Sequence, residues 1–214
     1  MRRAPARLTP RCAVLGAVLG AVALQVPASA APSPRPLVLL DRTDDTMPMT
    51  DGDLASVTFT TSGRLVAGGG QGEPEPQYVP ERLVVTLRTA DPIDTGGTTE
   101  YEVDSRVKGC DNGFDFWFTP GVPSSAGGGC SNGSGSELSA TGLVSPPVVG
   151  EHTVTFVFPF SAFPGRQIRP GTTISGIRAF TALVDPVTGF VGPYVVTGGL
   201  ANDELRTDRV YRVG

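Results

Sequence analysis

Short runs in which apolar and polar residues alternate follow one another along most of the chain. In Val57–Thr60 the two apolar side chains fall on one face and the two threonines on the other, as in a strand that is buried on one side. Residues 83–87 and 154–160 repeat this spacing with strongly apolar faces. Residues 101–108 alternate apolar or small with charged side chains, which predicts a strand with one charged, solvated face.

Further candidate strands lie between clusters of Gly, Pro, Asn and Asp. They are residues 37–40, 114–118, 137–144, 174–184, 190–196 and 209–213. About ten short strands without helical periodicity between them predict an all-β fold, a two-sheet antiparallel sandwich of jelly-roll type, with a closed β-barrel as the alternative. Two segments rich in Gly, 68–74 and 121–136, predict mobile loops, and a short helical turn capped by Asn202 is one interpretation of residues 201–205.

The N-terminus has the three zones of a secretory signal. Basic residues up to Arg11 precede an apolar run, Ala13–Val26, and small residues then lead to a cleavage site after Ala30. The apolar run has about 14 residues, whereas a membrane-spanning helix needs about 20. We therefore predict a secreted protein without a membrane segment in its mature form. Its parts are a signal peptide (1–30), a disordered lead-in (31–36) and a single domain (37–214).

Cleavage would change both the charge and the cysteine count. It removes four of the 17 basic residues and none of the 21 acidic ones, so the mature chain carries a net charge of −8. Such acidity argues against nucleic acid as a partner. Cleavage also removes Cys12, which leaves Cys110 and Cys130 as a pair in an oxidising compartment. The sequence predicts a disulfide between them, closing a loop of about 20 residues.

Five aspartates lie between the first two predicted strands. They are Asp41, Asp44, Asp45, Asp51 and Asp53. Ca²⁺ takes six to eight oxygen ligands, largely from carboxylates and carbonyls, so calcium is the candidate cofactor. A solvated turn is the alternative, because Asp and Gly are common in turns and the spacing is not that of an EF-hand. If a metal binds, the acidic residues Asp203, Glu204 and Asp208 are candidates for additional ligands from a neighbouring strand end.

The aromatic run Phe114–Phe118 predicts a strand with two different faces. A period of two sends the three phenylalanines to one side, and Asp115 with Trp117 to the other. A tryptophan beside a carboxylate is the composition of a sugar-binding platform, which makes Trp117 and Asp115 candidate ligand-binding residues. The alternative is that this face is also covered, because aromatic residues commonly stack inside sandwich cores.

Residue types needed for several enzymatic reactions are scarce. The chain has one histidine, His152, and no Gly-x-Ser-x-Gly sequence, which argues against a nucleophilic triad, and its one lysine, Lys108, argues against a lysine-based mechanism. Paired carboxylates for glycoside hydrolysis stay open, because any two of 21 acidic residues could converge in space. A non-catalytic binding protein is therefore favoured over an enzyme.

Three segments together resemble the layout of a known type of module. The order of Asp53–Phe59, Leu83–Leu87 and Phe156–Phe163 resembles secreted β-sandwich modules of the DOMON and family 9 carbohydrate-binding type. The ending Thr207–Tyr211 is similar to that of small uncharacterised secreted proteins of high-GC bacteria. The resemblance implies a β-sandwich and assigns no ligand-binding residue.

The sequence as a whole predicts a secreted binding module. An extracellular glycan or a cell-surface component is the expected partner, with calcium as candidate structural support. Two alternatives stay open: a structural or cell-surface interaction protein without a small-molecule ligand, and a glycan-active hydrolase that uses paired carboxylates.

Overall fold

The computed structural model of the protein describes the greater part of the predicted domain. The described residues are 35–41, 52–66, 76–111, 113–121, 126–132, 139–142, 146–163, 165, 167–183 and 203–214. The predicted signal peptide (1–30), the Gly-rich segment 68–74 and the candidate strand 190–196 lie outside the described residues.

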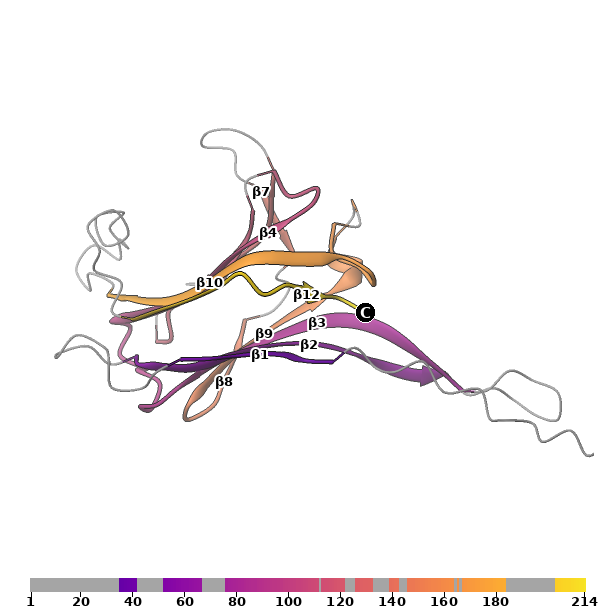
Figure 1. Cartoon of the computed structure of the whole chain (residues 1–214). Coiled ribbons are helices and arrows are strands. Elements are labelled where there is room, and N and C mark those ends of the chain that lie inside the picture. Colours follow the sequence, from indigo (N-terminus) through magenta and orange to yellow (C-terminus); the bar gives the residue numbers. More distant parts are fainter. Residues whose placement is uncertain are drawn as a thin grey trace, which may run out of the picture.

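The described strands form two antiparallel sheets that lie face to face (Figure 1). The five-stranded sheet has the order β1 (Leu37–Leu40), β2 (Leu54–Val66), β3 (Gln77–Thr89), β9 (Thr153–Pro159) and β8 (Val148–Val149). The seven-stranded sheet has the order β11 (Asp203–Thr207), β10 (Thr173–Leu183), β4 (Thr99–Val107), β5 (Phe114–Phe118), β6 (Ala126–Asn132) and β7 (Ser139–Gly142), with β12 (Tyr211–Arg212) paired to β10. A 3₁₀-helix, η1 (Phe160–Ala162), follows β9.

Aromatic side chains from both sheets fill the space between them. Phe116 of β5 contacts Phe156 and Phe158 of β9, with ring centroids 4.7 and 4.8 Å apart, and Phe114 lies 5.1 Å from Phe158. All four rings are fully buried. Tilted and edge-on ring pairs at this spacing add to the stabilisation from burial alone. The period-two pattern therefore places the phenylalanines in the core, as predicted from the sequence.

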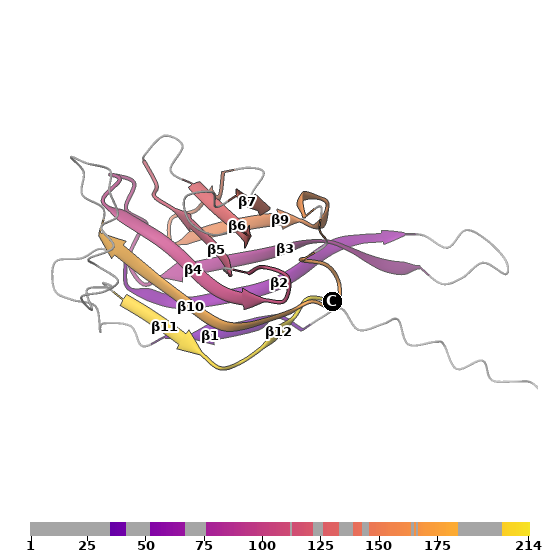
Figure 2. The ribbon, with the colours of Figure 1, turned by 90° about the horizontal axis from the view of Figure 1, so that it is seen from above.

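The predicted sandwich is confirmed, and the alternative of a closed barrel is wrong. Each described sheet is open and has two edge strands, which are β1 and β8 in one sheet and β11 and β7 in the other. Figure 1 shows the two sheets as separate layers, and Figure 2, viewed from above, shows one sheet overlying the other. Among the described residues, no helix has the length and apolar character needed to cross a membrane.

The predicted loop 121–136 is wrong in part, because it contains the strand β6. Although three of its seven residues are glycine, β6 pairs with β5 on one side and with β7 on the other. Backbone hydrogen bonds to two neighbours hold such a strand without any side-chain pattern. The predicted disulfide is confirmed: Cys110, shortly after β4, is bonded to Cys130 of β6, and their Cα atoms are 5.1 Å apart.

The helical turn considered for residues 201–205 is also wrong. Residues from Asp203 onward form β11, which pairs with Ile177–Thr181 of β10. Asn202, the expected cap, lies outside the described residues. The charged sequence of β11 is compatible with a helix locally, but the neighbouring edge of β10 offers a complete row of backbone partners, and tertiary context overrides the local preference.

Candidate functional site

Trp117 lies on the outer face of the seven-stranded sheet and is 37% exposed. It stands opposite Glu102 of β4 on one side and opposite Gly127 of β6 on the other. A Cβ atom added to Gly127 would lie 2.3 Å from the six-membered ring of Trp117. The ring therefore lies directly on the glycine backbone, a position that any larger residue at 127 would block.

Four acidic side chains share this outer face. Glu100, Glu102 and Asp104 alternate along β4, and Asp115 precedes Trp117 on β5. Glu102 and Asp104 are joined by a side-chain hydrogen bond. We call these four residues together with Trp117 the acidic face.

Burial and mutual repulsion favour the protonated forms on this face. Burial, followed by the charges of Asp104 and Glu100, raises the pKa of Glu102 to about 9. Burial raises the pKa of Glu100 to about 7, although a hydrogen bond from the Thr119 hydroxyl, 3.3 Å away, opposes the shift. The hydrogen bond between Glu102 and Asp104 adds to the rise in the pKa of Glu102 and opposes the rise in the pKa of Asp104, so the protonated form is favoured more strongly at Glu102.

The pKa of Asp104 is raised as well, chiefly by burial. The hydrogen bond from Glu102 and the positive charge of Arg178 act in the opposite direction. Asp104 thus accepts a hydrogen bond from Glu102 on one side and faces the Arg178 guanidinium on the other. The remaining carboxyl oxygens of the pair are hydrogen-bond acceptors within one small area of the sheet.

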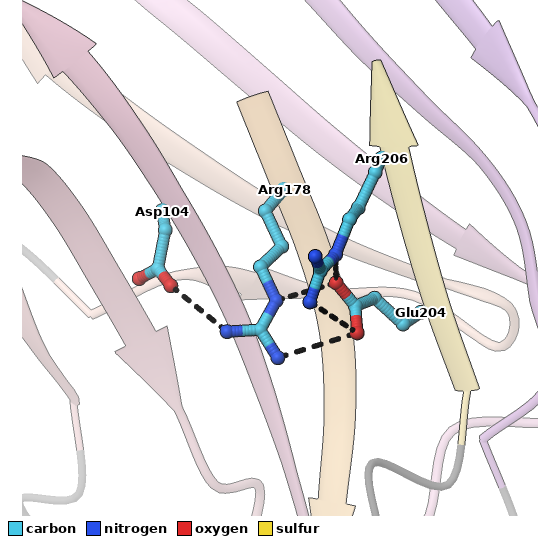
Figure 3. A network of polar contacts seen from close by, with 4 residues as sticks. All are labelled: Asp104, Arg178, Glu204 and Arg206. Carbon is cyan, nitrogen blue, oxygen red and sulfur yellow. Dashed lines mark hydrogen bonds and ion pairs between the residues drawn. The ribbon is translucent and has the colours of Figure 1, made fainter. Parts of the chain in front are cut away.

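A charged network continues across the sheet from Asp104 (Figure 3). Arg178 of β10 lies between Asp104, whose Oδ2 is 3.7 Å from Nη1, and Glu204 of β11, whose Oε1 is 2.6 Å from Nε. The Arg178 guanidinium also lies over the ring of Phe180, 4.4 Å from its centroid. Arg206 forms a second ion pair with Glu204.

The early aspartates fall partly within the described residues. Asp53 is buried, and the backbone N–H of Leu54 donates to Oδ2 of Asp203 at 2.5 Å. The Thr181 hydroxyl donates to the Gly52 carbonyl at 3.0 Å. The predicted proximity of Asp203 to this segment is confirmed. Glu204 instead pairs with Arg178 on the outer face.

The calcium prediction stays a prediction. Asp41 is described at the end of β1, whereas Asp44, Asp45 and Asp51 lie outside the described residues. In the part of the chain that the structure describes, no group of three or more His, Cys, Asp or Glu side chains is arranged to hold a metal ion. The contacts of Asp203 with the Leu54 backbone give this carboxylate a structural role at the junction of the two sheets.

The sequence predicted Trp117 and Asp115 as ligand-binding candidates and missed the acidic side chains beside them. Glu102 and Asp104 were expected on a charged face, but only the pairing of β4 with β5 brings that face against Trp117. Arg178, Glu204 and Arg206 were also missed as a group, because the order of β4, β10 and β11 in the sheet is not encoded in any local pattern.

Comparisons of the chain with protein-family models, curated protein sequences and solved structures find no match. The resemblance to DOMON and family 9 carbohydrate-binding modules therefore stays a prediction. Because a β-sandwich supports many activities, function has to be argued from the site itself.

Proposed function

We propose that the protein is a secreted, non-catalytic binding module and that its ligand is a carbohydrate bound on the acidic face. The observation that carries this proposal is the position of Trp117. Its ring lies close against Gly127 and is 37% exposed, on a sheet rather than on a loop. A rigid, exposed aromatic surface is suited to stacking against the C–H face of a sugar ring.

The carboxyl groups around Trp117 supply polar partners for sugar hydroxyls. Glu102, directly opposite Trp117, is protonated at neutral pH because burial raises its pKa to about 9. Because its one O–H is engaged with Asp104, Glu102 offers acceptor oxygens to a ligand, as Asp115 on the same strand as Trp117 does. Sugar hydroxyls can donate hydrogen bonds to such oxygens.

The disulfide supports the proposed compartment. Cys110 and Cys130 form the only cysteine pair that remains after the predicted signal peptide is removed, and they are bonded to each other. Disulfides persist in oxidising environments such as the extracellular space. An extracellular glycan or another cell-surface component is the partner that this location makes available.

A glycan array with matched variants tests the proposal. We expect the wild-type protein to bind a defined set of glycans, Trp117→Ala to lose at least about tenfold in affinity, and Trp117→Phe to lose less. Val149→Ala is the control, because Val149 is exposed to a similar degree, 39%, and lies on the other sheet. Binding that is equal in wild type and Trp117→Ala would refute the site, and a protein that binds no glycan would point to a structural or interaction role.

A glycan-active hydrolase is the second candidate, and the raised pKa of Glu102 favours it. A carboxyl group that is protonated at neutral pH is the general acid that glycoside hydrolysis requires. However, Glu102 and Asp104 share a hydrogen bond, so these two groups are closer than the roughly 5 to 10 Å at which glycosidase carboxyls work. Release of reducing sugar from an array glycan, abolished in Glu102→Gln, would establish hydrolysis; binding without release would exclude it for that glycan.

A further inference from the structure

A surface hollow of about 560 Å³ lies next to the network of Figure 3. Three guanidinium groups line it, and they come from three adjacent strands: Arg106 from β4, Arg178 from β10 and Arg206 from β11. Thr207 and a single lining carboxylate, Asp208, complete the polar part of its wall. Of the charged side chains that line the hollow, three are cationic and one is anionic, while Asp104 and Glu204 lie beside it as ion-pair partners of Arg178 and Arg206.

A bulge in β10 brings Arg106 to the hollow. The pairing of β10 with β4 shifts register between Ser175 and Arg178, and Gly176 within the bulge has a φ of +56°. A Cβ atom at Gly176 would lie 3.5 Å from Cδ of Arg106, so the stem of Arg106 passes over this glycine. A left-handed residue in a bulge favours glycine and re-aims the neighbouring side chains.

Arg178 is held in place by contacts on several sides. Nε and Nη2 donate to the Glu204 carboxylate at 2.6 and 3.3 Å, Nη1 lies 3.7 Å from Asp104, and the guanidinium plane covers Phe180. The two hydrogen bonds engage one donor each on Nε and Nη2, whereas a guanidinium has five N–H donors. Glu204 also forms an ion pair with Arg206. Arg178 is therefore oriented before any ligand arrives, which reduces the entropic cost of binding.

We propose that this hollow is a binding site for an oxyanion, namely a sulfate, phosphate or carboxylate group. Arg178 and Arg206 already bind one carboxylate, that of Glu204, and guanidinium groups match the geometry and charge of oxyanions. Such a site would also account for the grouping of three arginines around one hollow, in a chain whose net charge is −8 after the predicted cleavage. Two further hollows have basic linings, Arg35, Arg209 and Arg212 in one and Lys108 and Arg169 in the other.

A titration with sulfate, monitored by NMR, tests this proposal independently of any glycan. Protein labelled with ¹⁵N is titrated with sodium sulfate while sodium chloride keeps the ionic strength constant. We expect the Nε–Hε signals of Arg106, Arg178 and Arg206 to shift and to saturate. Shifts that stay linear in sulfate concentration, or that are equal at arginines of the other sheet, would overturn the proposal.

Matched variants test which residues carry the binding. Arg106→Gln and Arg206→Gln each remove one charge from an exposed lining residue and should weaken sulfate binding about tenfold, as expected for a charge-assisted hydrogen bond. Arg88→Gln, an equal charge change at an exposed residue of β3, should leave it unchanged. Equal weakening in all three variants would show a general charge effect and would contradict a defined site.

A second titration distinguishes a free ion from an acidic sugar as the ligand of the hollow. Binding of an acidic sugar rests on the proposed function, because the hollow and Trp117 lie on the same face of the sheet. A sulfated oligosaccharide should then bind more tightly than sulfate, its desulfated counterpart should bind more weakly, and the indole N–H of Trp117 should shift as well. Saturable arginine shifts without any response of Trp117 would assign a free ion to the hollow and would count against the proposed glycan site.

Discussion

The carboxyl group of Glu102 donates a hydrogen bond to the carboxylate of Asp104, two residues farther along the same face of β4. The two groups lie between Trp117 on one neighbouring strand and Arg178 on the other. Two carboxyl groups this close share one proton, because ionising both would place like charges side by side in a partly buried position. This arrangement gives the acidic face a dependence on pH that can be measured.

Glu102→Gln should make the protein more stable at alkaline pH. The folded-state pKa of Glu102, about 9, is above its unfolded value of 4.5, so the folded chain retains a proton that the unfolded chain loses. The contribution of this proton to the free energy of unfolding is complete below the unfolded-state pKa of Glu102. It is lost as the pH rises toward the folded-state pKa, by at most about 1.4 kcal/mol per pH unit. Urea unfolding between about pH 5 and pH 9 measures this loss.

The Glu102→Gln variant should show a flatter curve than wild type, with the two proteins equal near the acidic end. Asp91→Asn, at an exposed carboxylate in the turn after β3, is the control and should follow the wild-type curve. Parallel curves for wild type and Glu102→Gln across the whole range would mean that Glu102 is ionised in the folded protein.

Gly127→Ala should disturb Trp117 through direct contact. The added methyl group would lie 2.3 Å from the Trp117 ring, so the ring must move. We expect a loss of about 1–3 kcal/mol in the free energy of unfolding, which is typical of an overpacked contact. A double-mutant cycle with Trp117→Ala isolates the effect, because removing the ring removes the clash.

In that cycle, Gly127→Ala should cost little when Trp117 is already alanine. An equal cost in both backgrounds would indicate that the substitution acts on the backbone of β6 and not on the ring. The emission spectrum of Trp117 provides an independent readout, because it is the single tryptophan of the chain.

Reduction of the disulfide should destabilise the domain without changing its fold. The bridge joins Cys110 to Cys130 over a sequence separation of 20 and ties the turn after β4 to β6. On the chain-entropy model a loop of this size is worth about 3 kcal/mol. Thermal unfolding with and without reductant measures the change, with the Cys110→Ser/Cys130→Ser double variant as the control that reductant should not affect. No difference between the oxidised and reduced forms would show that β6 is held by its strand pairing alone.

Alternation along the chain predicts most of the strands and the core of this sandwich. β1 and β5 have the predicted bounds, and the buried positions of β2, β3 and β9 are those with the apolar spacing. In these strands one face is buried, so the alternation of apolar and polar side chains also determines which register of strand pairing is possible. β6 carries no such pattern, because its glycines contribute only backbone to the sheet, and its composition alone therefore predicts a loop.

The sequence predicts only those residues of the candidate site whose positions follow from a single strand. Trp117 and Asp115 could be placed on an outward face from the period of two alone. Glu102 was assigned a solvated face, but its burial and raised pKa come from neighbours on the same sheet. Arg106, Arg178 and Arg206 are far apart in sequence and meet because β4, β10 and β11 are adjacent, which is a property of the topology.

The fluorescence of Trp117 tests the proposed glycan site on the acidic face. Because Trp117 is the single tryptophan, every change in intrinsic tryptophan emission reports on the acidic face. Wild-type protein is titrated with a glycan selected on the array, and the accessibility of the ring to acrylamide is measured at each step. We predict a saturable change in emission together with protection of the ring from quenching. Saturable binding of the glycan with unchanged emission and unchanged quenching would place the ligand elsewhere and would refute the glycan site at Trp117.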